Sequence, residues 1–116
     1  MSVEVVAHRG ASGEFPENTT VAFEEAIRLG VETIEIDVRL TRDKQMVILH
    51  DYSVDRTSDG EGAVADLSLA AIKELDAGSW FHTRFSGARF LTLAETLDLM
   101  PKAMKLNVHV KETEED

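Results

Sequence analysis

The sequence predicts one soluble domain of the α/β class over residues 1–116, and two observations carry that prediction. Short apolar runs typical of strands alternate along the chain with segments whose apolar residues recur at helical spacing. The composition is 43% hydrophobic and 29% charged over 116 residues, which is typical of a globular chain of single-domain length.

Charge and composition exclude several classes of function. Twelve Lys and Arg against 22 Asp and Glu give a net charge of −10, which argues against nucleic acid or an anionic membrane as the main partner. The absence of cysteine excludes disulfides, zinc–thiolate sites and a cysteine nucleophile. No apolar run approaches the roughly 18 residues of a membrane span, and the N-terminus does not resemble a signal peptide, so we expect a cytoplasmic location.

The first third of the chain is typical of a strand followed by a helix. Val3–His8 is an apolar run that ends at Arg9-Gly10, which predicts a strand. Glycines and a proline make the next stretch a loop. Asn18 or Thr19 can cap a helix that runs to about Leu29, where a glycine follows.

The most informative segment is Thr33–Leu40, in which apolar residues alternate with charged ones. A period of two predicts a strand with one apolar face and one face formed by Glu35, Asp37 and Arg39. Met46–His50 is a second short strand. Because a parallel crossover needs a dozen or more residues, we expect it to return antiparallel and to bring its histidine beside the carboxylates.

The middle of the chain predicts less regular structure. The segment Asp51–Asp66 is rich in Asp, Ser and Gly and predicts a long loop. Ser68 can cap a short helix that runs through about Asp76. Aromatic residues and glycines are mixed over Gly78–Arg89, which we interpret as an irregular insertion.

The last third predicts a helix and a strand. Thr92 and Glu95 have the spacing of a capping box, and the helix that they start should end before Pro101. Lys105–Lys111 alternates again between apolar and polar residues, which predicts a strand.

Polar side chains gather at or towards the carboxyl ends of the predicted strands, where α/β sheets place their active sites. A solvated polar face is the simpler explanation for each strand taken alone. Helices covering the opposite face would, however, turn these charges into a core or cleft. Burying a cluster of unpaired charges is costly, so a metal ion or an anionic ligand bound among them is the better explanation. The candidates are Glu35 and Asp37 for a Mg²⁺ or Ca²⁺ ion, His8 and His50 for proton transfer, and Arg9 and Lys111 for a phosphate. Metal, acid/base pair and cations together indicate chemistry at a phosphodiester.

The motifs, in their order, resemble the glycerophosphodiester phosphodiesterases of the phospholipase-C-like phosphodiesterase superfamily. The matching pieces are His8-Arg9-Gly10, Pro16-Glu17-Asn18-Thr19, Ala22-Phe23, Glu35-Ile36-Asp37-Val38, Thr41-Arg42-Asp43, His50-Asp51, Arg56-Thr57, Gly62, Thr92-Leu93-Ala94-Glu95, Leu106-Asn107 and Lys111. They cover nearly the whole chain, and the ordered set is specific although each piece is weak.

The resemblance implies part of a (β/α)₈ TIM barrel, with about three barrel strands, a β-hairpin and an insertion. It implies hydrolysis of a small glycerophosphodiester, with a divalent cation, to an alcohol and glycerol 3-phosphate. A neighbouring substrate hydroxyl attacks phosphorus first in related enzymes, which gives a cyclic phosphate. By similarity the roles are acid/base catalysis for His8 and His50, phosphate binding for Arg9 and Lys111, metal binding for Glu35 and Asp37, and shaping of the site loop for Glu17 and Asn18.

One residue departs from the family pattern. The family has a glutamate two residues before the lysine, completing the metal site, and this chain has His109 there. Imidazole suits Mn²⁺ or Zn²⁺ better than Mg²⁺ or Ca²⁺. We therefore expect weaker binding of hard cations, a changed metal preference, or lost activity.

The length is the second departure. The predicted barrel strands are Val3–His8, Thr33–Leu40 and Lys105–Lys111, whereas a TIM barrel has eight strands in about 250 residues. Either the chain is the N-terminal part of a longer barrel, or copies associate as a homo-oligomer that completes it. The alternative to an active phosphodiesterase is an inactive relative that binds a phosphate ligand or a protein partner.

Overall fold

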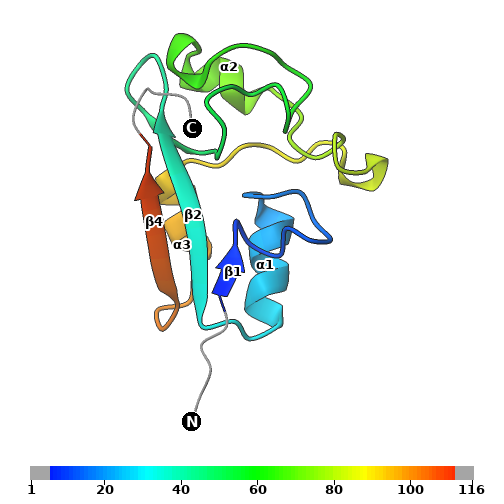
Figure 1. Cartoon of the computed structure of the whole chain (residues 1–116), viewed down its shortest axis with the longest axis vertical. Coiled ribbons are helices and arrows are strands. Elements are labelled where there is room, and N and C mark those ends of the chain that lie inside the picture. Colours follow the sequence, from blue (N-terminus) through cyan, green and yellow to red (C-terminus); the bar gives the residue numbers. More distant parts are fainter. Residues whose placement is uncertain (1–5, 112–116) are drawn as a thin grey trace.

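The computed structural model describes residues 6–111, in which a four-stranded sheet is covered by helices (Figure 1). The central strand β2 pairs parallel with β1 and β4 and antiparallel with β3. The strands are β1 (Val6–His8), β2 (Thr33–Leu40), β3 (Met46–Ile48) and β4 (Lys105–Val110). The helices are α1 (Thr20–Arg28), α2 (Leu69–Lys73) and α3 (Leu93–Leu99), with 3₁₀ turns η1 (Val64–Asp66) and η2 (Thr83–Phe85).

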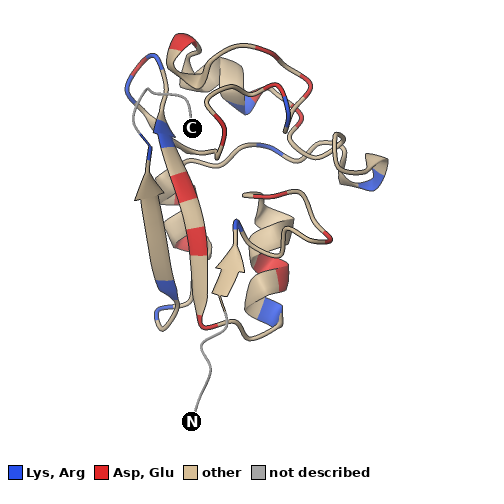
Figure 2. Cartoon of the chain, in the orientation of Figure 1, with Lys and Arg blue, Asp and Glu red and all other residues tan. Residues whose placement is uncertain are grey.

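The period-two prediction for β2 is confirmed, and it decides where the core lies. Ile34, Ile36 and Val38 are fully buried in one cluster with Phe23 and Ala26 of α1. Burial of each large aliphatic side chain stabilises the fold by about 1.5–3 kcal/mol. The opposite face of β2 therefore carries the charged residues, and Figure 2 shows acidic positions, in red, in the middle of this strand.

Helix α1 begins and ends near the predicted residues. Thr19 is its N-cap, with extended backbone, but its hydroxyl donates to the Pro16 carbonyl at 2.6 Å and does not accept from the helix. Gly30, directly after the C-cap, has a φ of 81°. A left-handed glycine at this position is a common helix end.

Strand β3 returns antiparallel, as predicted, but it ends at Ile48 and not at His50. The reason lies in the partners of the next residues. Leu49 still donates its N–H to the Asp37 carbonyl at 3.0 Å, whereas the His50 carbonyl accepts from the Arg39 guanidinium at 2.8 and 2.9 Å. A buried side chain thus replaces the strand ladder at this point.

The second predicted helix is also shorter than expected, since α2 ends at Lys73. The Asp76 carboxylate accepts hydrogen bonds from the backbone N–H groups of Gly78 and Ser79, at 2.8 and 2.9 Å. Asp76 therefore organises a turn instead of continuing the helix. The hydrogen bond from the Ser79 hydroxyl, and then these two backbone bonds, hold the pKa of Asp76 well below its ordinary value.

Three further predictions concern the remaining segments. The capping box of α3 is confirmed, because Thr92 and Glu95 exchange side-chain to backbone hydrogen bonds. The predicted loop and insertion contain the short turns η1 and η2. The first part of the predicted strand Val3–His8 lies outside the described residues.

Strand β4 lies at the edge of the sheet, where Val108 and Val110 are 38% and 65% exposed. It ends at Val110, one residue before the predicted end, although the Lys111 N–H still donates to the Val38 carbonyl at 2.8 Å. No helix in the described part of the chain is long and apolar enough to cross a membrane.

Candidate active site

The two carboxylates of β2 form the centre of the candidate site. Their side chains are only 13% and 3% exposed for Glu35 and Asp37, on the face opposite the core. The Oδ2 atom of Asp37 is buried without a hydrogen-bond partner. An ionised buried carboxylate is costly unless its charge is compensated. The Arg9 guanidinium, whose Nε lies 3.6 Å from this oxygen, supplies one compensating charge without a hydrogen bond.

His109 completes a group of three donors with these carboxylates. Parallel pairing sets Asp37 opposite His109, which places Nδ1 of the imidazole 4.0 Å from Asp37 Oδ1 and Nε2 3.8 Å from Glu35 Oε2. One ligand atom from each of the three residues lies within 4.8 Å of the others. Two carboxylates and an imidazole suit a divalent cation, and Asp37 Oδ2, which has no hydrogen bond, is available as a further oxygen ligand.

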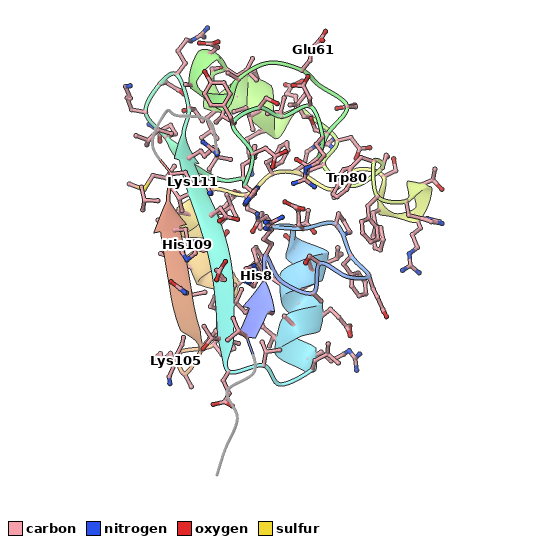
Figure 3. The ribbon with its side chains drawn as sticks, in the orientation of Figure 1. His8, Glu61, Trp80, Lys105, His109 and Lys111 are labelled. Atoms are coloured by element: carbon pink, nitrogen blue, oxygen red, sulfur yellow. The ribbon has the colours of Figure 1, made fainter. Side chains whose placement is uncertain are left out.

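His8 lies on the other flank of the carboxylates. The strand β1 pairs His8 with Glu35, and Nδ1 of the imidazole lies 3.2 Å from Glu35 Oε1. The His8 side chain is 65% exposed, so a ligand can reach it. Figure 3 shows His8 and His109 on strands that flank β2 on opposite sides.

Arg9 is aimed at the same site by an unusual backbone conformation. Its φ is 57°, its N–H donates to the Glu35 carbonyl at 2.7 Å, and its carbonyl accepts from the Asn18 N–H at 2.8 Å. The guanidinium lies 3.3 Å from Glu17 and 3.6 Å from Asp37. Arg9 is thus held between a loop carboxylate and a candidate metal ligand.

His50 faces a carboxylate that follows it in the chain. Its Nδ1 lies 2.8 Å from Asp51 Oδ1, and the Arg56 guanidinium bonds both oxygens of Asp51 at 2.8 and 3.0 Å. Arg56 first, and then His50, lower the pKa of Asp51 to about 2 against the opposing effect of burial. Asp51 is therefore ionised at neutral pH.

Asn18 and Lys111 are the two remaining predicted residues. The side-chain amide of Asn18 is buried, and neither of its polar atoms has a hydrogen-bond partner. Lys111 follows β4 at the carboxyl end of the sheet, two residues beyond His109 (Figure 3). Both therefore remain predicted site residues.

Two arginines make contacts in the site that the sequence did not predict. Arg56 bonds both Asp51 and Glu17, and Arg39 holds the carbonyl of His50. Asp51 and Arg56 stand in matching motifs, but nothing in their spacing indicates that they pair with each other or with Glu17. For Arg39 the only signal was its place on the charged face of a strand.

Comparison with known proteins gives one consistent result. Residues 8–116 match the model of the glycerophosphoryl diester phosphodiesterase family. The chain is 47% identical over 112 residues to a glycerophosphodiester phosphodiesterase of Caldanaerobacter subterraneus, covering 96% of this chain and 46% of that protein. It is 40% identical to one of Bacillus subtilis, covering 91% of this chain and 39% of the relative.

Solved structures agree with these relatives. A phosphodiesterase of Oleispira antarctica in complex with its product sn-glycerol-3-phosphate matches with a TM-score of 0.90 and 40% identity, over 95% of this chain and 45% of that one. A glycerophosphodiester phosphodiesterase of Agrobacterium tumefaciens matches with a TM-score of 0.91 and 36% identity, over 94% and 47%. Such neighbours are TIM barrels, so the predicted partial barrel is confirmed. The chain spans less than half the length of these relatives.

Proposed function

The chain belongs to the glycerophosphoryl diester phosphodiesterase family, and on this premise we propose that it supplies the metal-binding and proton-transfer groups for hydrolysis of a glycerophosphodiester to an alcohol and glycerol 3-phosphate. The observation that carries the proposal is the group of ligand atoms from Glu35, Asp37 and His109 within 4.8 Å of one another. The likeness to a structure holding sn-glycerol-3-phosphate supports the choice of substrate class.

Glu35, Asp37 and His109 would hold the divalent cation. When bound, such a cation supplies Lewis-acid stabilisation of the charge on phosphoryl oxygens. The imidazole at position 109 favours Mn²⁺ or Zn²⁺, whereas the two carboxylates also accept Mg²⁺ or Ca²⁺. The metal preference would therefore depend on the balance between the one nitrogen ligand and the two carboxylate ligands.

His8 and His50 would move the protons. Cleavage forms one bond from phosphorus to the attacking oxygen, of a substrate hydroxyl or of water, and breaks the bond to the leaving alcohol oxygen. One imidazole accepts the proton of the attacking oxygen, and the other, as imidazolium, donates a proton to the leaving oxygen. Histidine suits both tasks because its ordinary pKa lies near neutrality.

The phosphate would be held by Arg9 and Lys111. A guanidinium can give two parallel hydrogen bonds to a phosphate, and an ammonium acts as a point charge. Glu17 would keep Arg9 in place, since it lies 3.3 Å from the guanidinium. Asn18 would shape the loop, because its N–H bonds the Arg9 carbonyl.

A second candidate function is a catalytically inactive domain that binds a phosphate ligand or a protein partner. His109 favours it, because this residue replaces the glutamate that the family pattern has in the metal site. Inorganic phosphate or glycerol 3-phosphate would then raise the melting temperature without turnover of a diester. Release of glycerol 3-phosphate from a diester would thus distinguish the active enzyme from the inactive binding domain.

The test is hydrolysis of glycerophosphocholine with Mg²⁺, Ca²⁺, Mn²⁺ and Zn²⁺ in turn. We expect turnover with at least one cation, and loss of at least a hundredfold in His8→Ala and in His50→Ala, since general acid–base catalysis contributes about 10²–10⁴-fold. His82→Ala is the matched control, because His82 is an exposed histidine at the start of η2. Absence of turnover with every cation would rule out an active enzyme.

A further inference from the structure

The imidazole of His50 and the carboxylate of Asp51 form a hydrogen bond whose direction can be assigned. An ionised carboxylate has no proton and only accepts. Asp51 is ionised at neutral pH, and His50 Nδ1 lies 2.8 Å from its Oδ1. The proton in this bond therefore belongs to Nδ1 of His50.

Arg56 holds the carboxylate in this orientation. Its Nε lies 2.8 Å from Asp51 Oδ2 and its Nη2 lies 3.0 Å from Oδ1. These two bonds fix the plane of the carboxylate, because a planar guanidinium matches both oxygens at once. The side chains of Asp51 and His50 are 27% and 25% exposed, so the pair is partly shielded from water.

The same guanidinium reaches a second loop. Arg56 lies 3.1 and 3.0 Å from the two oxygens of Glu17, whose side chain is 8% exposed. Glu17 in turn contacts Arg9 at 3.3 Å. A chain of ion pairs therefore connects His50, through Asp51, Arg56 and Glu17, with Arg9.

We propose that Asp51 and Arg56 are positioning residues which hold His50 as its Nδ1–H tautomer, so that Nε2 is the atom that exchanges a proton with the substrate. The proposal rests on the proposed acid/base role of His50. Neither residue needs to touch the substrate for this purpose. The hydrogen bond at one ring nitrogen sets which nitrogen is protonated, and thereby orients the other.

The test is ¹⁵N NMR of the full chain labelled at histidine, at a pH where the imidazoles are neutral and with no substrate or metal added. His50→Gln identifies the signals of His50. We expect a pyrrole-type Nδ1 and a pyridine-type Nε2 in the wild type, whereas free histidine favours the opposite tautomer. An Nε2–H tautomer in the wild type would overturn the proposal.

Variants separate positioning from a general effect on the fold. Asp51→Ala removes the acceptor and should move the His50 signals towards the mixture of free histidine. Arg56→Gln should move the His50 signals part of the way towards those of free histidine. Arg56→Lys should move them less, because the lysine ammonium keeps the positive charge but cannot donate two parallel hydrogen bonds to the carboxylate. Unchanged signals of His50 in Asp51→Ala would contradict the proposed role.

Exposed charged residues outside the ion-pair chain serve as controls. Glu61→Ala and Arg42→Gln remove one charge each from exposed residues and should leave the His50 tautomer unchanged. Because the measurement needs no turnover, an inactive chain with Nδ1–H His50 would argue against the proposed function alone. If Asp51→Ala fails to fold, the wild-type tautomer and the Arg56→Lys variant still decide the question.

Discussion

The imidazole of His109 lies beside the carboxylate of Glu35, with Nε2 3.8 Å from Oε2. This neighbour relation follows from the register of β2 and β4, in which Asn107 stands opposite Glu35 and His109 opposite Asp37. The side chain at position 109 therefore reaches both carboxylates of the candidate metal site, and its chemistry should set the metal preference.

The first prediction is that His109→Glu tightens the binding of Mg²⁺ and Ca²⁺ and weakens that of Zn²⁺. A third carboxylate adds a hard oxygen ligand and a negative charge, and removes the nitrogen. We expect a change of roughly tenfold in the dissociation constant, or about 1.4 kcal/mol, measured by calorimetry. His82→Glu is the control, and the same affinities in wild type and His109→Glu would exclude position 109 as a ligand.

The second prediction concerns the buried carboxylate at the centre of the site. Asp37→Asn removes the charge of a side chain that is 2% exposed, and should abolish stabilisation by added metal. Metal at one hundred times its dissociation constant should stabilise the wild type by about 2.7 kcal/mol. Urea unfolding with and without Mn²⁺ measures this difference. Asp98→Asn, on the exposed side of α3, should keep the full metal effect.

The third prediction is a loss of stability in acid that depends on Asp51. Arg56 lowers the folded pKa of this carboxyl to about 2, below its ordinary value of 3.8. A lowered folded pKa stabilises the fold above the unfolded pKa, and that contribution is lost progressively as the pH falls from about 4 through the folded pKa of about 2. The partly exposed position limits it to about 1–2 kcal/mol.

Asp51→Asn isolates this contribution, since Asp76 and other carboxyl groups also have lowered pKa values. The difference in free energy of unfolding between wild type and Asp51→Asn should be largest at pH 7, shrink as the pH falls through the unfolded pKa, and lose its pH-dependent part only below about pH 2. Glu61→Gln should show no such dependence. A difference that stays constant from pH 7 to pH 2 would exclude the ion pair as its cause.

The fourth prediction concerns the turn after Arg9. Gly10 has a φ of 80°, and a Cβ there would lie 2.8 Å from the backbone of Ala22 in α1. Gly10→Ala should therefore destabilise the fold by about 1–3 kcal/mol, through strain and a displaced helix. Gly13→Ala is the matched control, because a Cβ at Gly13 meets nothing within 4 Å. Equal midpoints of urea unfolding for the two variants would contradict this reading.

The fifth prediction concerns the free edge of β4. Within the described range, this strand pairs with β2 and with no other strand, and Val110 is 65% exposed. Such an edge tends to bind another strand. We predict that copies of the chain associate and that Val110→Lys lowers the mass measured by light scattering. Leu29→Lys, at a different exposed apolar residue, should not, and a wild-type monomer stable to dilution would refute association.

Periodicity explains why the core and the charged face could be predicted from the sequence. In a strand, successive side chains point to opposite faces, so the alternation over Thr33–Leu40 by itself separates Ile34 and Ile36 from Glu35 and Asp37. The capping box at Thr92 was equally local, since its partners are three residues apart. Local patterns of this kind need no knowledge of distant residues.

The register and the long-range ion pairs were decided only by the tertiary structure. Pairing of β2 with β4 brings His109 to Asp37, 72 residues earlier in the chain, and Arg56 meets Glu17 from 39 residues away. The early end of β3 has the same origin, since Arg39 bonds the His50 carbonyl from a different strand. Helix α2 ends instead at a local turn, in which Asp76 accepts from the N–H groups of Gly78 and Ser79. A sequence period reports the orientation of side chains within one element. The choice among distant partners depends on how the elements pack, because burial makes an unpaired charge or backbone group costly.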